Sequence, residues 1–292
     1  MKTLLRLLAG IALLSQGSSA WAQFMTNVAL NKETYLTFEA VEATVTISNR
    51  SGADIVMGGA NNQAWLTFTV TAPDGSSVPA MHTRSDETIV FKAGSTISRK
   101  VLVSDTHPFS EYGNYMISAT VYHPPSQQYY ASNRARATFT DATPFWEQSY
   151  GVPLGLPGAG QIRRYTLSQL RDTERTYLYV RVLDDKTKLK LATYSLGTCI
   201  FIAHPQVTVD NHNMLHVLFM AAPHIYSHVI IDTQGQLVRR RYHQEIKTDR
   251  PQLGVGADGE ISVSGGQPYD PAAANEAQKP KGRSIREKPP GL

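Results

Sequence analysis

The strongest constraint on the fold is a period of two in the apolar residues of the first half of the chain. Apolar and polar residues alternate over residues 41–47, 66–70, 115–121 and 135–139, and turn sequences separate these runs. In a strand, this period turns one face toward the core and the other toward water. Several short strands with regular turns are typical of an antiparallel sandwich. We therefore expect an all-β chain that begins with a sandwich over residues 23–141.

Two of these runs also carry a resemblance. Residues 39–49 read EAVEATVTISN, and residues 112–119 read YGNYMISA. They resemble an early strand and the penultimate strand of bacterial immunoglobulin-like domains. The combination is similar to macroglobulin-type modules and to the sandwich of intracellular proteinase inhibitors of bacilli. The resemblance implies an immunoglobulin-like sandwich, with protease inhibition among its functions, but many unrelated functions use this fold.

The pattern breaks after the sandwich. Residues 142–162 contain Pro144, Pro153 and Pro157, and four glycines lie within residues 151–160. Proline and glycine at this density are typical of a semi-extended connector. We expect this segment to join the sandwich to a second β-rich unit.

The second unit, residues 163–268, contains an internal repeat. Residues 205–209 read PQVTV, and residues 251–255 read PQLGV, 46 positions later. The ungapped register also equates Asn213 with Gly259, Leu215 with Ile261, and Val217 with Val263. A fainter third copy is predicted to begin at residues 177–182. A period in this range is typical of propeller blades.

The repeats resemble those of bacterial propeller and sialidase-like proteins, although the chain lacks the S-x-D-x-G-x-x-W box of sialidases. A closed propeller needs at least about four blades, and this unit has room for about two. We expect an open, blade-like unit whose edges are capped by the first domain, the connector or another subunit. Oligomerisation through the blade edges follows as one expectation.

The N-terminus has the three parts of a secretory signal. A basic start is followed by an apolar run over residues 7–14 and by Ala20-Trp21-Ala22, an A-x-A cleavage site. The run is too short for a membrane-spanning helix, and no later stretch is long enough. We predict a signal peptide over residues 1–22, cleavage after Ala22, and a secreted or periplasmic mature chain without a transmembrane segment.

Charge and cysteine content exclude several classes of protein. The net charge is +4, but Lys2 and Arg6 lie in the signal, and residues 269–292 form a basic tail that we expect to be disordered. The remaining body is close to neutral, so we expect no nucleic-acid partner. Cys199 is the single cysteine and lies in an apolar run, which excludes an intramolecular disulfide and predicts a small buried side chain.

Two groups of residues invite a chemical interpretation. His212 and His216, like His224 and His228, are four residues apart, which on a helix would suit zinc. The surrounding residues indicate strands and turns, and four residues along a strand separate side chains by about 13 Å, too far for one metal ion.

The carboxylate pairs Asp184-Asp185 and Asp172/Glu174 lie beside basic residues in expected turns, so we interpret them as solvated charges rather than as a glycosidase pair. No Gly-x-Ser-x-Gly elbow accompanies Ser264 or His107, which disfavours a serine hydrolase. We therefore assign no catalytic, cofactor-binding or metal-ligating residue and expect no cofactor.

Three consecutive arginines, residues 239–241, leave two interpretations open. Alternation would place Arg239 and Arg241 on one face, where they would form either a site for an anion or acidic partner or a solvated edge strand. The sequence as a whole favours an exported, non-enzymatic protein for binding, adhesion or envelope assembly, with a protein or glycan partner at the cell envelope. The alternative is a carbohydrate-active or other hydrolytic enzyme fragment with a propeller-like unit.

Overall fold

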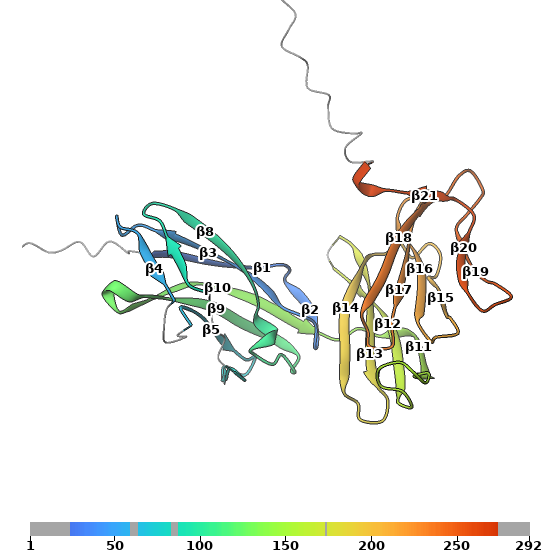
Figure 1. Cartoon of the computed structure of the whole chain (residues 1–292), viewed down its shortest axis with the longest axis horizontal. Helices are drawn as coiled ribbons and strands as arrows, with labels where there is room; N and C mark the ends of the chain where they lie inside the picture. Colours follow the sequence, from blue (N-terminus) through green and yellow to red (C-terminus); the bar gives the residue numbers. More distant parts are fainter. Residues whose placement is uncertain (1–23, 59–63, 83–86, 173, 274–292) are drawn as a thin grey trace, which may run out of the picture. The chain divides into compact units, whose positions relative to one another are not determined.

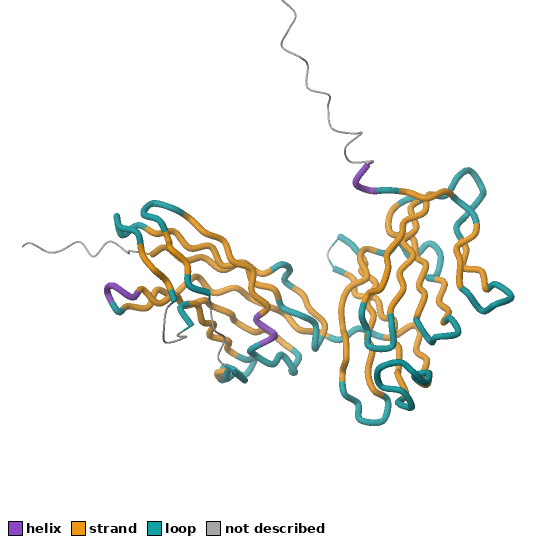
Figure 2. Tube along the Cα trace, viewed as in Figure 1, coloured by secondary structure: helices purple, strands orange, loops and turns teal. Residues whose placement is uncertain are grey.

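The computed structural model describes residues 24–58, 64–82, 87–172 and 174–273 and divides the chain into the units Met1–Thr140 and Asp141–Leu292 (Figure 1). The predicted signal peptide and residues 274–292 of the predicted tail lie outside the described residues. Strands dominate both units, which confirms the all-β class (Figure 2). Within the described part, no helix is long and apolar enough to cross a membrane.

In the described residues, the first unit is built from strands and two 3-10 helices. They are β1 (Phe24–Leu30), β2 (Thr34–Leu36), β3 (Glu42–Asn49), β4 (Ile55–Met57), β5 (Leu66–Thr71), β6 (Ser77–Val78), β7 (Ile89–Phe91), β8 (Thr96–Leu102), η1 (Val103–Asp105), β9 (Gly113–His123), η2 (Pro124–Ser126) and β10 (Gln128–Thr140). The sheet orders are β1-β3-β8, β2-β10-β9-β5-β6 and β4-β7. One core cluster joins residues of all three sheets, as a sandwich requires.

The predicted alternation decides which side chains fill this core. Val45 and Ile47 in β3, and Ile117 and Ala119 in β9, are fully buried, whereas the residues between them are partly exposed. A bulge in β10 adds a contact that alternation does not predict. At this bulge the Asn133 side chain accepts from the Val28 N–H at 2.8 Å and donates to the Val28 carbonyl at 3.0 Å. Asn133 thus replaces a strand-to-strand hydrogen-bond pair and ties β1 to the opposite sheet.

The second unit contains eleven strands in the described residues. They are β11 (Pro144–Gly151), β12 (Ile162–Arg171), β13 (Thr176–Asp184), β14 (Lys190–Thr198), β15 (Gln206–Val209), β16 (Leu215–Ala222), β17 (Ile225–Ile231), β18 (Leu237–Gln244), β19 (Gln252–Val255), β20 (Ile261–Ser264) and β21 (Gln267–Tyr269). Consecutive strands pair antiparallel in two four-stranded meanders, β11-β12-β13-β14 and β15-β16-β17-β18. The strand β21 pairs with β18 at the edge of the second meander, and β19 and β20 form a separate hairpin.

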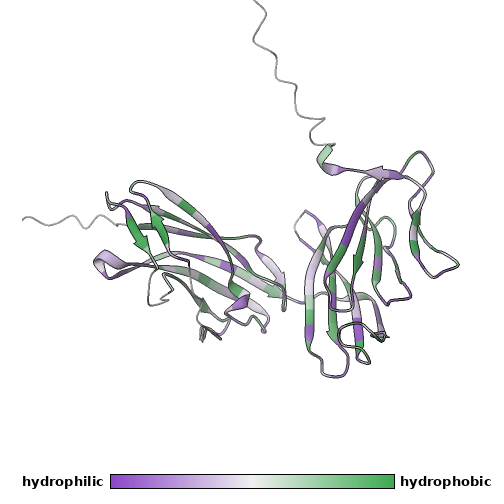
Figure 3. Cartoon of the chain, in the orientation of Figure 1, coloured by the Kyte–Doolittle hydropathy of each residue, from purple (hydrophilic) through white to green (hydrophobic). Residues whose placement is uncertain are grey.

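A single apolar core connects the two meanders. Leu167 and Val180 of the first meander and Val217 and Val229 of the second belong to the same buried cluster. Figure 3 shows the matching hydropathy, with β16 and β17 largely hydrophobic and β18 hydrophilic over its arginines. The second meander therefore uses one face to build this core.

Three expectations for this half need correction. Residues 142–162 are not only a connector, because residues 144–151 form β11 and pair with β12 along its length. The fainter third copy at residues 177–182 lies in β13, the third strand of its meander, so it is not equivalent to β15, which is a first strand. The predicted tail starts too early, because Tyr269 still pairs with Tyr242 of β18.

The 46-residue repeat, in contrast, corresponds to two hairpins of the same build. In β15–β16 Val207 pairs with Val217 and Val209 with Leu215; in β19–β20 Leu253 pairs with Val263 and Val255 with Ile261. The turns match as well, since Asn213 and Gly259 both have positive φ (58° and 79°). The register predicted from the sequence is confirmed.

Candidate functional site

The outer face of the second meander points away from the core between the meanders. It contains histidines and arginines to which the sequence analysis gave a possible chemical role. Cross-strand pairing fixes which side chains share this face. One row across the strands contains Thr208, His216, Ile230 and Arg239, and the next contains Gln206, Leu218, His228 and Arg241. Arg240 lies on the opposite face, paired with Val229.

The histidines on this face pair across strands rather than along them. His216 Nδ1 lies 3.1 Å from His228 Nε2, and both rings are buried. Their partners in the spacing pattern, His212 and His224, lie in exposed turns. Sequence spacing alone could not find this contact, because it depends on the register between β16 and β17.

Asp210 fixes the orientation of the pair. Its Oδ1 accepts from the backbone N–H groups of His212 and Met214 at 2.9 Å each, and its Oδ2 lies 3.4 Å from His216 Nε2. Burial lowers the pKa of both histidines, that of His228 to about 4, and the neighbouring His216 and His243 lower it further. In the described part of the chain, no cluster of three or more His, Cys, Asp or Glu side chains could hold a metal ion. The lowered pKa values favour the neutral form of both imidazole rings at neutral pH.

The predicted carboxylate pair at residues 184–185 is held in ion pairs. Buried Arg163 donates to Asp184 at 2.8 Å and to the Thr233 carbonyl at 2.8 Å, which joins β12 to the turn before β18. Thr187 donates to Asp184 through its N–H and hydroxyl groups, and these bonds lower the pKa of that carboxyl. Asp184 is therefore a buried structural charge, which corrects its interpretation as solvated.

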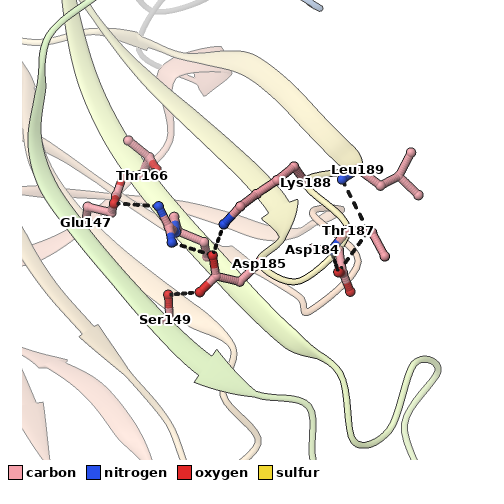
Figure 4. A network of polar contacts seen from close by, with 9 residues as sticks. Glu147, Ser149, Thr166, Asp184, Asp185, Thr187, Lys188 and Leu189 are labelled. Atoms are coloured by element: carbon pink, nitrogen blue, oxygen red, sulfur yellow. Dashed lines mark hydrogen bonds and ion pairs between the residues drawn. The ribbon is translucent and has the colours of Figure 1, made fainter.

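Asp185 belongs to a second network, shown in Figure 4. It accepts from Lys188 at 2.8 Å, from Ser149 at 3.1 Å and from Arg164, and Arg164 also contacts Glu147 at 3.3 Å. The hydrogen bond from Lys188 is the main cause of the lowered pKa of Asp185. A carboxylate with a lowered pKa and three donors is poorly suited to general acid catalysis at neutral pH. Between the carboxylates of the other predicted pair, Asp172 and Glu174, lies residue 173, which is outside the described residues.

A pocket of about 570 Å³ lies at one end of the second unit and is lined by Arg175, Cys199, Phe201 and Pro223 among others. Cys199 is buried, as predicted, and burial raises the pKa of its thiol to about 12. A thiol with a raised pKa is protonated at neutral pH and is therefore a weak nucleophile. Cys199 therefore lines this pocket as a small, uncharged side chain.

Arg239 and Arg241 are the exposed charges of the outer face. Both side chains are exposed, and no ion pair involves either of them within the described residues. The β19–β20 hairpin covers another part of the same face, because Leu253 and Val263 pack on Leu218, Met220 and Tyr226. The face is thus closed over its apolar part and open over its arginines.

Comparisons with known proteins add no assignment. A scan against models of protein families finds no match, and a search of curated proteins finds no relative. The sporulation control protein Spo0M from Bacillus subtilis is similar in structure with a TM-score of 0.31 and 9% identity, covering 60% of this chain and 91% of that protein. A likeness at this level carries no argument about function.

Proposed function

We propose that this chain is an exported, non-enzymatic binding protein that acts at the cell envelope and holds its partner at the outer face of the second meander. One observation carries the proposal: the β19–β20 hairpin repeats β15–β16 but ends after two strands, beside exposed arginines. An uncovered strand edge is a ready site for pairing with another chain. The export part rests on the signal-like residues 1–22.

The proposal also assigns a fold type to each unit: immunoglobulin-like for the first unit and blade-like for the second. For an immunoglobulin-like first unit, support comes from Tyr115 near the start of β9, whose hydroxyl accepts from the backbone N–H of Glu111 at 3.1 Å. A tyrosine that bonds back to the upstream backbone is a hallmark of such sandwiches. For a blade-like second unit, support comes from the four-stranded meanders and the repeated hairpin.

Site-specific photocrosslinking in the producing cell tests the binding role. A benzoylphenylalanine placed at Ser262 on β20 should form one discrete adduct, the same in independent cultures. Ser98 is the matched control, because it is also an exposed serine on an edge strand, β8 of the first unit. Equal labelling at both sites, or no adduct at Ser262, would contradict binding at this face.

Export is tested separately by sequencing the N-terminus of the mature protein. The proposal predicts that the protein recovered from the periplasm or medium begins at Gln23. A full-length chain retained in the cytoplasm would refute the envelope location, whatever the crosslinking shows.

A further inference from the structure

The β19–β20 hairpin leaves part of the outer face of the second meander without a covering strand in the described residues. The β15–β16 hairpin lies against the first meander and is continued by β17 and β18, whereas in the described residues β20 pairs with β19 alone. The packing of Leu253 and Val263 places the hairpin over β16 and the start of β17. The next strand position beyond β20 therefore lies over the part of the face that contains Arg239 and Arg241.

The backbone of β20 has N–H groups that point away from β19, where a further strand could accept hydrogen bonds from them. Hydrogen-bonded and non-hydrogen-bonded pairs alternate in an antiparallel hairpin, and Gly256 donates to Glu260 at the turn. Ile261 and Val263 therefore belong to non-hydrogen-bonded pairs, and their N–H groups point away from β19. The cross-strand partner of Val263 supports this assignment, because the Leu253 N–H also points outward and donates to Gln206 Oε1 at 2.8 Å.

Charge selects the kind of strand that fits. A strand next to β20 would turn alternate side chains toward Arg239 and Arg241, which lack carboxylate partners in the described residues. Acidic side chains at alternate positions of such a strand would neutralise both arginines. An extended acidic segment would accept hydrogen bonds from the outward N–H groups of β20 and would neutralise the charges of the two arginines.

A second copy of the chain does not fit this place. Pairing β20 with β20 of another copy would create one four-stranded sheet above two second meanders. Neighbouring strands are about 4.8 Å apart, so a four-stranded sheet has room beneath it for one such meander and not for two. The occupant must therefore be a segment that brings no sheet of its own beneath it.

We propose that an extended, acidic segment of a partner protein adds to β20 as the next strand and seats its acidic side chains on Arg239 and Arg241. This inference rests on the proposed binding function and specifies how the partner is held. Backbone hydrogen bonds to Ile261 and Val263 supply affinity, and the arginines supply selectivity for negative charge.

The charge requirement is tested with a fluorescent nine-residue peptide of alternating Glu and Val and the mature protein, residues 23–292. Fluorescence anisotropy should show saturable binding, which the R239E/R241E variant weakens by at least about tenfold. The control is R134E/R136E, which reverses two exposed arginines with the same spacing on β10. A peptide of alternating Lys and Val should not bind.

The backbone requirement is tested with Ile261→Pro, which removes one outward N–H, and with Ile261→Ala, which removes the side chain but keeps the N–H. The alanine variant should bind the peptide and the proline variant should not, with equal melting temperatures showing that both are folded. Absence of binding to the wild-type protein, or equal binding to all variants, would overturn strand addition. If the Ser262 adduct nevertheless formed, the binding function would stand and only this mode of binding would fail.

Discussion

The two hairpins of the second unit start from the same local structure and end in different surroundings. Both follow a buried proline, Pro205 or Pro251, have the same register and turn on a residue with positive φ. Each also packs its equivalent residues on the preceding sheet, Val217 on the first meander and Val263 on the second. Local sequence therefore specifies the hairpin and the face by which it docks.

Their burial differs because only the first hairpin is covered on both faces. Val217 is fully buried and His216, on the other face, is 3% exposed, whereas Val263 is partly exposed and the equivalent Ser262 is exposed. The second hairpin covers the first, and no described strand covers the second. The comparison teaches that the burial of a repeat depends on its neighbours as much as on its own sequence.

The largest difference is expected for an aspartate at the two equivalent valines. Val217→Asp places an unpaired charge in the core and should lower the free energy of unfolding by about 4 kcal/mol. Val263→Asp should cost about 1 to 2 kcal/mol, because water reaches this site. Urea denaturation of both variants measures the difference, and equal losses would mean that the two hairpins are equally buried.

The residues on the opposite face give the next largest contrast. His216→Ala should cost about 2 to 3 kcal/mol, since it opens a cavity and leaves polar atoms of His228 and Asp210 without a partner. Ser262→Ala should change the free energy of unfolding by less than about 0.5 kcal/mol, as exposed sites usually do. A low cost at His216 would show that the histidine pair does not stabilise the fold.

The turns should differ less, and here the hairpins can be tested for equivalence. Gly259→Ala should cost about 1 kcal/mol because of its positive φ alone, since no atom lies closer than 3.5 Å to the added carbon. Gly259→Asn copies the residue of the first turn, Asn213, and should cost less than half as much. Thermal melts of both variants check this order, and the reverse order would contradict the match between the turns.

Acidification should affect the first hairpin and produce the smallest change. The folded pKa values of His216 and His228 lie below the ordinary value of ~6.5, that of His228 at about 4. Between the folded and the unfolded pKa values, the unfolded chain binds more protons than the folded chain. The contribution of the histidine pair to the free energy of unfolding is therefore complete above pH ~6.5 and is lost as the pH falls. The titratable and charged groups around the pair are Asp210, Glu260, Arg239, Arg241 and His243.

The measurement compares the stability of three proteins at pH 7 and pH 6. His228→Leu should lose less stability than the wild-type protein, because one titrating group is absent. Ser262→Ala should lose as much as the wild-type protein, since the second hairpin has no such group. If His228→Leu lost as much stability as the wild type, the pair would not be the origin of the pH dependence.

Most of the fold could be predicted from local patterns. Alternation around Val45 and Ile117 identified core strands, and the ungapped repeat equated Val217 with Val263, which hold the same place in their two hairpins. Both signals depend only on residues near each other in the chain. The strand β11 was missed because residues 142–162 are rich in proline and glycine, although Phe145 and Trp146 lie within this strand.

The candidate site could be predicted only in part. Alternation placed Arg239 and Arg241 on one face, but it could not show that the face is open there and covered beside it. The contact between His216 and His228 and the burial of Asp184 depend on pairing between distant segments. Such contacts leave no local period, so they become visible only when the sheets are assembled.

Amide hydrogen exchange, followed by NMR, tests the central claim that β20 has an open edge. In the free protein the Val217 N–H, which faces β17, should exchange only on global unfolding, whereas the Val263 N–H should exchange far faster. Addition of the Glu/Val peptide should slow exchange at Val263 and Ile261 and leave Val217 unchanged. Equal, slow exchange at Val217 and Val263 in the free protein would show that the edge is already covered and would contradict the account.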